Sequence, residues 1–151
     1  MLCDEQFDRS SLIAVRKHVT ACGAAQGLEH MPLTWFTLAT HEIVVNAVHH
    51  GGGRGRLQLW RTGNVLHCLV SDEGPGVPDR YRSLRPHPSR GNSWNSGHGL
   101  WLAGQFCSHV EITARPGGGT DVLLEFPLPA YPESPTRPND IGPGPEAPST
   151  P

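Results

Sequence analysis

The chain has 151 residues, a formal net charge of −2 and 36% hydrophobic residues, which is enough for one folded domain with its own core. Nine of its 15 prolines fall near the C-terminus, where three of four charged residues are acidic, so the rest of the chain is close to neutral. This balance argues against broad binding to a nucleic-acid backbone, and no apolar run is long enough to span a membrane.

The change in composition near Pro127 predicts a folded domain over residues 1–127 and a proline-rich tail over residues 128–151. We expect the tail to be extended and mobile, because it offers few side chains to bury. The N-terminus lacks the basic-then-apolar pattern of a secretion signal, which favours a cytoplasmic protein. The four cysteines form no CxxC pair, and we expect reduced, mostly buried thiols.

Two helices are predicted first. Apolar residues recur at steps of three and four after Asp8, and Gly23 follows the last of them, which predicts a short amphipathic helix between those residues. A second helix is predicted from Pro32, a residue suited to the first turn, to His50. The glycine run at residues 51–53 ends it.

The remaining pattern is mostly that of strands. Residues 56–62 and 65–72 alternate with period two around Gly63-Asn64, which predicts a β-hairpin. An irregular loop spans residues 73–97, a brief apolar helix starts after Gly99, and strands are predicted at residues 110–115 and 120–126. Helices beside consecutive hairpins predict an α+β two-layer sandwich, with the helices on one face of a mostly antiparallel sheet.

The second helix carries a polar stripe on an otherwise apolar surface. Glu42 and Asn46 are four residues apart and share one side, with His49 and His50 one turn further on. Burying an unpaired carboxylate costs several kcal/mol, so the stripe is expected to face a cation, a ligand or trapped water. The alternative is a solvated helix face.

Asp72 ends the second strand of the hairpin on the same face as three apolar residues. If that face packs on the helices, Asp72 points into the same interior as Glu42. Gly74 and Gly76 follow, where backbone or a flat ligand can approach closely. The alternative is an ordinary turn at the end of a strand.

A third motif is Gly97-His98-Gly99-Leu100, which places glycines directly before a helix. Free N–H groups and the positive end of the helix dipole make such a junction favourable for polyphosphate, although glycines before a helix are common.

The three motifs stand in a fixed order, ExxxNAxxHG, DxGxG and GxGL, with a long loop between the last two. In this order the chain resembles the GHKL ATPase superfamily, whose shared domain has the Bergerat fold. The resemblance covers about residues 8–127. Segments such as HEIVVNAVHHG and GHGLWLAGQFCSHVEI are similar to the stand-alone bacterial anti-sigma-factor serine kinases.

The resemblance implies a site for ATP and Mg²⁺. Glu42 matches the family's glutamate that acts as general base or polarises the attacking group, and Asn46 matches its magnesium-binding asparagine. Asp72 matches the aspartate that accepts a hydrogen bond from the adenine amino group. His50 matches the histidine before the glycine, whereas His49 has no counterpart and is expected to be solvated or structural.

The rest of the implied site consists of glycines and loop residues. Gly74 and Gly76 match the glycines beside the base, and the loop before Gly97 would cover the nucleotide, with Arg90 as its nearest phosphate-contacting arginine. The phosphate end of the pocket would be formed by Gly97, His98, Gly99 and Leu100.

Two departures from the family pattern are visible. Relatives have a strand before the first helix, but only about seven residues precede Asp8, so this strand is expected to be short or missing. Many relatives have arginine at the position of His98, and loss of a permanent charge would weaken phosphate contact at neutral pH.

Three functions follow from the resemblance. The first is an ATP-binding anti-sigma factor that holds a sigma factor and phosphorylates a serine or threonine of an antagonist protein, with neither nucleic acid nor membrane as a direct partner. The second is a module that uses ATP only as a structural ligand while sequestering its sigma factor. The third is the detached catalytic part of a histidine kinase. Whether the chain forms a homodimer is left open.

Overall fold

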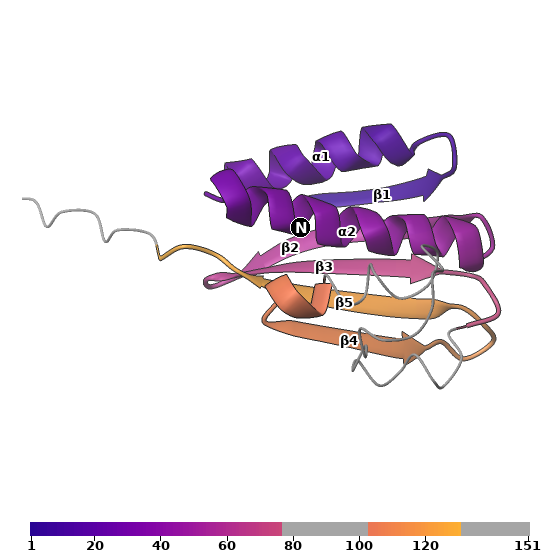
Figure 1. Ribbon diagram of the computed structural model, residues 1–151. Helices are drawn as coiled ribbons and strands as arrows, with labels where there is room; N and C mark the ends of the chain where they lie inside the picture. The colour runs from indigo at the N-terminus through magenta and orange to yellow at the C-terminus, as the bar shows by residue number, and fades with distance from the viewer. Residues whose placement is uncertain (77–102, 131–151) are drawn as a thin grey trace, which may run out of the picture.

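The computed structural model describes residues 1–76 and 103–130 of the chain. The elements are β1 (Cys3–Asp8), α1 (Leu12–Ala25), α2 (His30–His50), β2 (Arg54–Thr62), β3 (Val65–Asp72), β4 (His109–Ala114) and β5 (Thr120–Pro127). A further helical turn lies at residues 103–106. Figure 1 shows α1 and α2 side by side over one face of a sheet, which is the predicted two-layer arrangement.

The sheet of the described residues has five strands in the order β1-β2-β3-β5-β4, and every neighbouring pair is antiparallel. The predicted hairpin is confirmed: β2 and β3 pair from Gly55↔Asp72 to Thr62↔Val65 around the two-residue turn. The two later strands are confirmed as β4 and β5. The predicted tail lies beyond the described residues, except for residues 128–130, and Leu128 is still buried.

The strand before the first helix is present, contrary to our expectation that it would be short or missing. β1 has six residues and pairs with β2 along its whole length. The connection from β1 to the first helix needs few residues because it is a tight turn. In it, the side chain of Asp8 accepts hydrogen bonds from the backbone N–H groups of Ser10 (2.8 Å) and Ser11 (3.2 Å). Asp8 therefore ends β1, and the helix begins only at Leu12.

Gly23 does not close the first helix as predicted, because α1 continues to Ala25. A Cβ atom at Gly23 would lie 2.9 Å from side-chain atoms of both Leu33 and Phe36, so glycine lets the two helices approach closely. The second helix begins at His30, two residues before the predicted Pro32. Pro32 fits there because the first turn of a helix leaves its N–H groups unpaired.

The core lies between the helices and the sheet. Alternate residues of β2 and β3 turn toward the helices and are fully buried, as are Phe36 and Val44 of α2. The rings of Phe36 and Phe126 meet edge to face at 5.7 Å. All four cysteines are free, and Cys68 is buried in this core while the other three are half-buried. The other face of the sheet carries no described helix (Figure 1).

Candidate functional site

The polar stripe of α2 has two central groups that the described residues cover only in part. Glu42 and Asn46 are half-buried, whereas Ile43 and Ala47, the residues that follow them, are buried. Within residues 1–76 and 103–130, neither side chain forms a hydrogen bond or an ion pair with another residue. Trp35, two turns earlier on this side, stacks on Phe106 with ring centroids 4.5 Å apart. The stripe therefore points to the side of the sheet where the turn at residues 103–106 lies.

The histidines near the stripe have different surroundings. His49 and His50 are exposed at the end of α2, with ring centroids 6.4 Å apart. His41, which the sequence analysis did not single out, is half-buried beside Glu42. Burial and then the charge of Arg16 lower the pKa of His41, while Glu42 opposes this shift. A neutral imidazole is thus favoured next to the candidate base at neutral pH.

Asp72 is held by backbone groups at the end of β3. Its Oδ1 atom accepts hydrogen bonds from the N–H groups of Gly74 (3.0 Å) and Thr120 (3.1 Å). The other carboxylate oxygen, Oδ2, has no hydrogen-bond partner among the described residues. Asp72 lies in register with Gly55, on the face of the sheet that packs on the helices. Asp72 therefore lies on the face that the alternation predicted, and Oδ2 is its one carboxylate oxygen without a partner among the described residues.

Asp72 also packs directly against the C-terminal end of α2. A Cβ atom at Gly51 would lie 2.5 Å from Cγ of Asp72, and one at Gly74 would lie 2.5 Å from Cα of Gly51. The carbonyl oxygen of His50 would be 2.8 Å from the same Cβ at Gly74. The structure thus brings together two of the three sequence motifs, with glycines where their backbones meet.

The turn between β4 and β5 completes this junction, and its contacts with Gly74 and Asp72 are what the sequence did not predict. The N–H group of Gly119 donates to the carbonyl oxygen of Gly74 at 2.7 Å. Thr120 is buried and holds Asp72 through its own N–H group. The available signal was a Gly-Gly-Thr sequence at the start of a strand. Its role depends on the pairing of β3 with β5, which the local pattern does not reveal.

Gly119 supplies a sharp test of this junction. Gly119 has φ of 98° and a Cβ there would overlap the carbonyl oxygen of Asp72, whereas Gly117 has φ of 88° with nothing within 4 Å of its Cβ. Because a non-glycine residue at such φ costs about 1–3 kcal/mol, we expect Gly117→Ala to lower the free energy of unfolding by that amount. Gly119→Ala should lower the free energy of unfolding by more, because its Cβ would also overlap the carbonyl oxygen of Asp72. Urea denaturation measures both variants. Equal losses of stability would show that the close contact of Gly119 with Asp72 does not contribute to the fold.

The third motif falls outside the described residues. Arg90, Gly97, His98, Gly99 and Leu100 all lie in the range 77–102, so their predicted roles stay predictions. Gly76 is the last described residue before this range and has φ of 88°.

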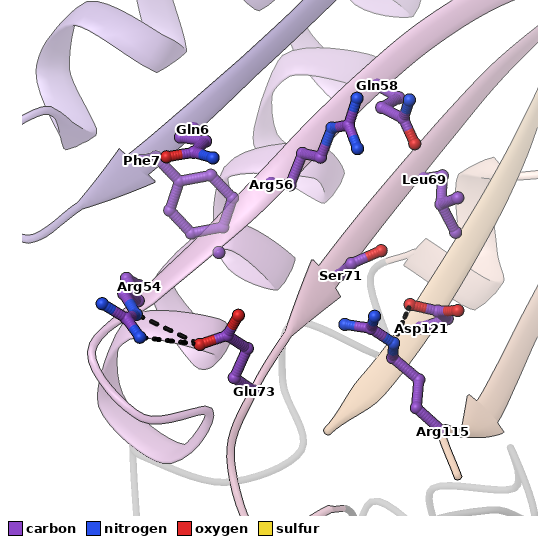
Figure 2. Close-up of a pocket in the computed structure, with 11 residues that line it drawn as sticks. Gln6, Phe7, Arg54, Arg56, Gln58, Leu69, Ser71, Glu73, Arg115 and Asp121 are labelled. Carbon is purple, nitrogen blue, oxygen red and sulfur yellow. Dashed lines mark hydrogen bonds and ion pairs between the residues drawn. The ribbon is translucent and has the colours of Figure 1, made fainter. Parts of the chain in front are cut away.

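A groove of about 560 Å³ lies on the opposite face of the sheet, and Arg115 in its lining donates to the carbonyl oxygen of Asp72 at 3.3 Å. Figure 2 shows its lining side chains, of which Arg56, Gln58, Leu69 and Ser71 alternate with the buried residues of β2 and β3. Arg54 pairs with Glu73 at 2.9 Å, and Arg115 lies 3.7 Å from Asp121. Its cations are thus balanced by carboxylates, and exposed pairs of this kind contribute little to stability.

Residues 6–126 match the family described as the histidine kinase-like ATPase domain. Signal transduction histidine-protein kinase AfsQ2 of Streptomyces coelicolor is 32% identical over an alignment of 115 positions that covers 69% of this chain and 20% of that protein. The anti-sigma F factor of Thermoanaerobacter sp. is 29% identical over an alignment of 91 positions that covers 57% of this chain and 64% of that protein. The aligned regions thus span less than two thirds of either relative.

The anti-sigma F factor of Shouchella clausii is 26% identical over 102 residues, which cover 64% of this chain and 70% of that protein. Two solved structures have the same fold: the mycobacterial sensor histidine kinase MprB, with a TM-score of 0.54 and 17% identity, and the catalytic domain of histidine kinase ThkA, with 0.52 and 15%. Each comparison covers 83% of this chain and 97% of the other.

None of the helices within the described ranges is long and apolar enough to cross a membrane. The family match spans both described parts of the chain, and the motifs of α2 and β3 lie inside it. The helices on one face of an antiparallel sheet agree with the Bergerat fold that the sequence predicted. The chain belongs to the histidine kinase-like ATPase domain family.

Proposed function

We propose that this protein is an ATP-binding anti-sigma factor that phosphorylates a serine or threonine of an antagonist protein. The observation that carries the proposal is the meeting of Asp72 with the end of α2. This helix also bears Glu42 and Asn46, which have no hydrogen-bond partner among the described residues. The similarity to two anti-sigma F factors supports the regulatory role. Because sigma factors act in the cytoplasm, we place the protein there.

Asp72 would select adenine. Its Oδ1 is engaged by two backbone N–H groups, so Oδ2 is the acceptor available to the adenine amino group. A guanine base presents a carbonyl oxygen at that position, and two acceptors facing each other would repel. Gly74 and Gly76 would let the flat base lie close to the backbone. Affinity for ATP should therefore exceed affinity for GTP.

Asn46 fits the role of a magnesium ligand, because its amide is half-buried and engaged with no other described residue. No group of three or more His, Cys, Asp or Glu side chains among residues 1–76 and 103–130 is arranged to hold a metal ion. Nucleotide oxygens and water would supply the other ligands, as is usual for this ion. Bound magnesium neutralises charge on the phosphate groups.

Glu42 would act as the general base. It lies one turn from Asn46, and a carboxylate there can accept the proton of a substrate hydroxyl as its oxygen attacks the γ-phosphorus atom. Because the pKa of His41 is lowered, its imidazole is neutral at neutral pH and places no positive charge beside the Glu42 carboxylate. His50, Arg90, Gly97, His98, Gly99 and Leu100 complete the proposed nucleotide site.

Incubation with γ-labelled ATP, magnesium and candidate antagonist proteins tests the proposal. Label on serine or threonine of an antagonist is the expected result, with Glu42→Gln protein as the control. Label on histidine of a partner would instead indicate the catalytic part of a histidine kinase, a reading that the similarity to AfsQ2 also supports. Saturable ATP binding without any transfer would indicate a module that sequesters its sigma factor without phosphorylation.

A further inference from the structure

A second groove, of about 580 Å³, lies on the outer surface of the two helices. Six of its lining residues come from α1, at positions 13, 16, 17, 20, 21 and 24, and this spacing places them on one side of the helix. The buried residues Val15 and Val19 turn to the core instead. His41 of α2 also lines the groove, and the hydroxyl oxygens of Thr20 and Thr37 lie 3.1 Å apart where the helices meet. The groove thus runs along α1 beside α2.

This groove carries two cations that have no acidic partner among the described residues. Arg16 and Lys17 are exposed, and neither side chain forms a hydrogen bond or an ion pair with another residue of the ranges 1–76 and 103–130. α1 itself contains no aspartate or glutamate. By contrast, each arginine of the groove on the open sheet face is paired with a carboxylate. The charge of the helix groove therefore favours an acidic ligand.

One end of the groove adds an apolar contact. Ile13 is 74% exposed there, although an isoleucine side chain is more stable when it is buried. Arg16 and Lys17 follow Ile13 by about one turn, so this end offers an aliphatic side chain next to two cations. The small side chains of Ala21 and Ala24 continue the groove toward the C-terminal end of α1. A matching ligand has a carboxylate beside an aliphatic side chain.

The described chain ends near the opposite end of this groove. Pro129 packs on the connection between α1 and α2, where a Cβ atom at Gly27 would lie 3.8 Å from Cγ of Pro129. The N–H group of Gly27 donates to the carbonyl oxygen of Ala24 at 3.0 Å, so this contact is one turn from the groove. Leu128 is buried, and its N–H group donates to the carbonyl oxygen of Asn64 at 2.8 Å. Figure 1 shows β5 ending on the side where α1 ends and α2 begins.

The sequence that follows Ala130 has the chemistry of such a ligand. Residues 131–151 contain three acidic residues and one arginine, so the negative charge of the chain is concentrated there. Ile141 is the only large aliphatic residue of this segment, and Asp140 stands directly before it. Prolines recur every third residue at 132, 135 and 138, a pattern that favours an extended chain. Asp140-Ile141 therefore matches the far end of the groove in both charge and polarity.

We propose that residues 131–141 bind in the helix groove of the same chain, with the carboxylate of Asp140 beside the two cations and Ile141 against Ile13. The segment stays extended in this contact but is held in place, whereas composition alone predicts that it is mobile. The bound segment covers the outer surface of both helices. It thereby closes the groove to acidic segments of other proteins.

The lengths of the groove and of the segment allow this contact. The groove extends from Ala24 to Ile13, about 16 Å along the axis of α1 at 1.5 Å per residue. An extended chain advances about 3.1 Å per residue, so the residues from Ala130 to Ile141 reach up to about 34 Å. The tether also gives the segment an effective concentration on the order of millimolar at the groove. A weak contact is therefore enough to populate the bound form.

Backbone amide relaxation of the full chain, measured by NMR, tests the proposal. We expect order parameters above about 0.6 at Asp140 and Ile141 and below about 0.6 at Thr150, which lies beyond the bound segment. Ile141→Ser should lower the order parameter of Asp140 below this value and shift the amide signal of Ile13. Ala147→Ser is the matched control, because it changes a tail residue outside the bound segment, and it should alter neither.

Reversal of charge tests the contact from the side of the groove. Lys17→Glu should release the segment, because the new carboxylate repels Asp140, and the combination of Lys17→Glu with Asp140→Lys should hold it again. Arg9→Glu is the control for the change of charge, since Arg9 is exposed, precedes α1 and does not line the groove. It should leave the order parameter of Asp140 at the wild-type value.

Three results would overturn the proposal. Order parameters below about 0.6 throughout residues 131–151 of the wild type would show that no segment is held. An unchanged signal of Ile13 in Ile141→Ser would leave the groove for an acidic segment of another protein. Ordering that grows with protein concentration would place the segment on a second copy of the chain. The experiment needs no nucleotide, so its outcome is separate from that of the proposed kinase function.

Discussion

Asp72→Asn is expected to weaken binding of ATP and ADP by about 10- to 100-fold. A hydrogen bond to a charged acceptor contributes about 1.5–3 kcal/mol, and each 1.4 kcal/mol is a tenfold change in affinity. The structure makes asparagine a specific probe here. Its Oδ1 can still accept from Gly74 and Thr120, so only the outward oxygen becomes an N–H donor. That donor would face the adenine amino group without an acceptor.

Asp4→Asn is the matched control for this variant. Asp4 is exposed on the edge strand β1, lies opposite Gln58 and pairs with Arg56 at 2.7 Å. The same change of charge there should leave nucleotide affinity unchanged. Isothermal titration calorimetry of both variants with ATP and ADP measures the difference. Wild-type affinity in Asp72→Asn would remove Asp72 from the adenine site, even if ATP still binds elsewhere.

Glu42→Gln is expected to reduce phosphotransfer by about 100- to 10,000-fold, the usual contribution of a general base. The amide keeps the shape of the side chain but has little basicity. Because Glu42 has no hydrogen bond or ion pair with another described residue, its replacement should hardly affect folding. ATP affinity should change by no more than a few-fold, since the base acts on the protein substrate.

Glu29→Gln is the control for this second variant. Glu29 is exposed and precedes α2 at its N-terminal end, far along the helix from Asn46. It should transfer phosphate at the wild-type rate. Initial rates with labelled ATP and excess antagonist protein compare the two variants. An unchanged rate in Glu42→Gln would mean that the base is another residue or that none is needed.

Local sequence patterns predicted the elements whose signals are local. The hairpin of β2 and β3 follows from alternation around Gly63, and α2 follows from a long apolar pattern ended by glycines. β1 was underestimated because an edge strand depends on pairing with β2, which lies about fifty residues further along the chain. Gly23 was misread because its close contact with α2 looks the same in sequence as a helix-ending glycine.

The residues of the candidate site likewise divide into those that a local sequence pattern identifies and those that depend on pairing between distant strands. Glu42, Asn46 and Asp72 were identifiable because each stands at a fixed step within one element. Gly119 and Thr120 were not, because they act through backbone groups across the pairing of β3 with β5. A backbone N–H group exists in almost every residue. Its role becomes visible only when the fold places it 3.1 Å from Oδ1 of Asp72.

Binding of adenine nucleotide where Asp72 meets the end of α2 can be followed by a nitrogen–proton correlation NMR titration of the wild-type protein with ATP and magnesium. We expect saturable shifts at Asn46, Gly74 and Thr120, none at Gln58 on the open sheet face, and much weaker effects with GTP. Saturable shifts confined to the open face, or no saturable shifts at millimolar ATP, would contradict binding at this place.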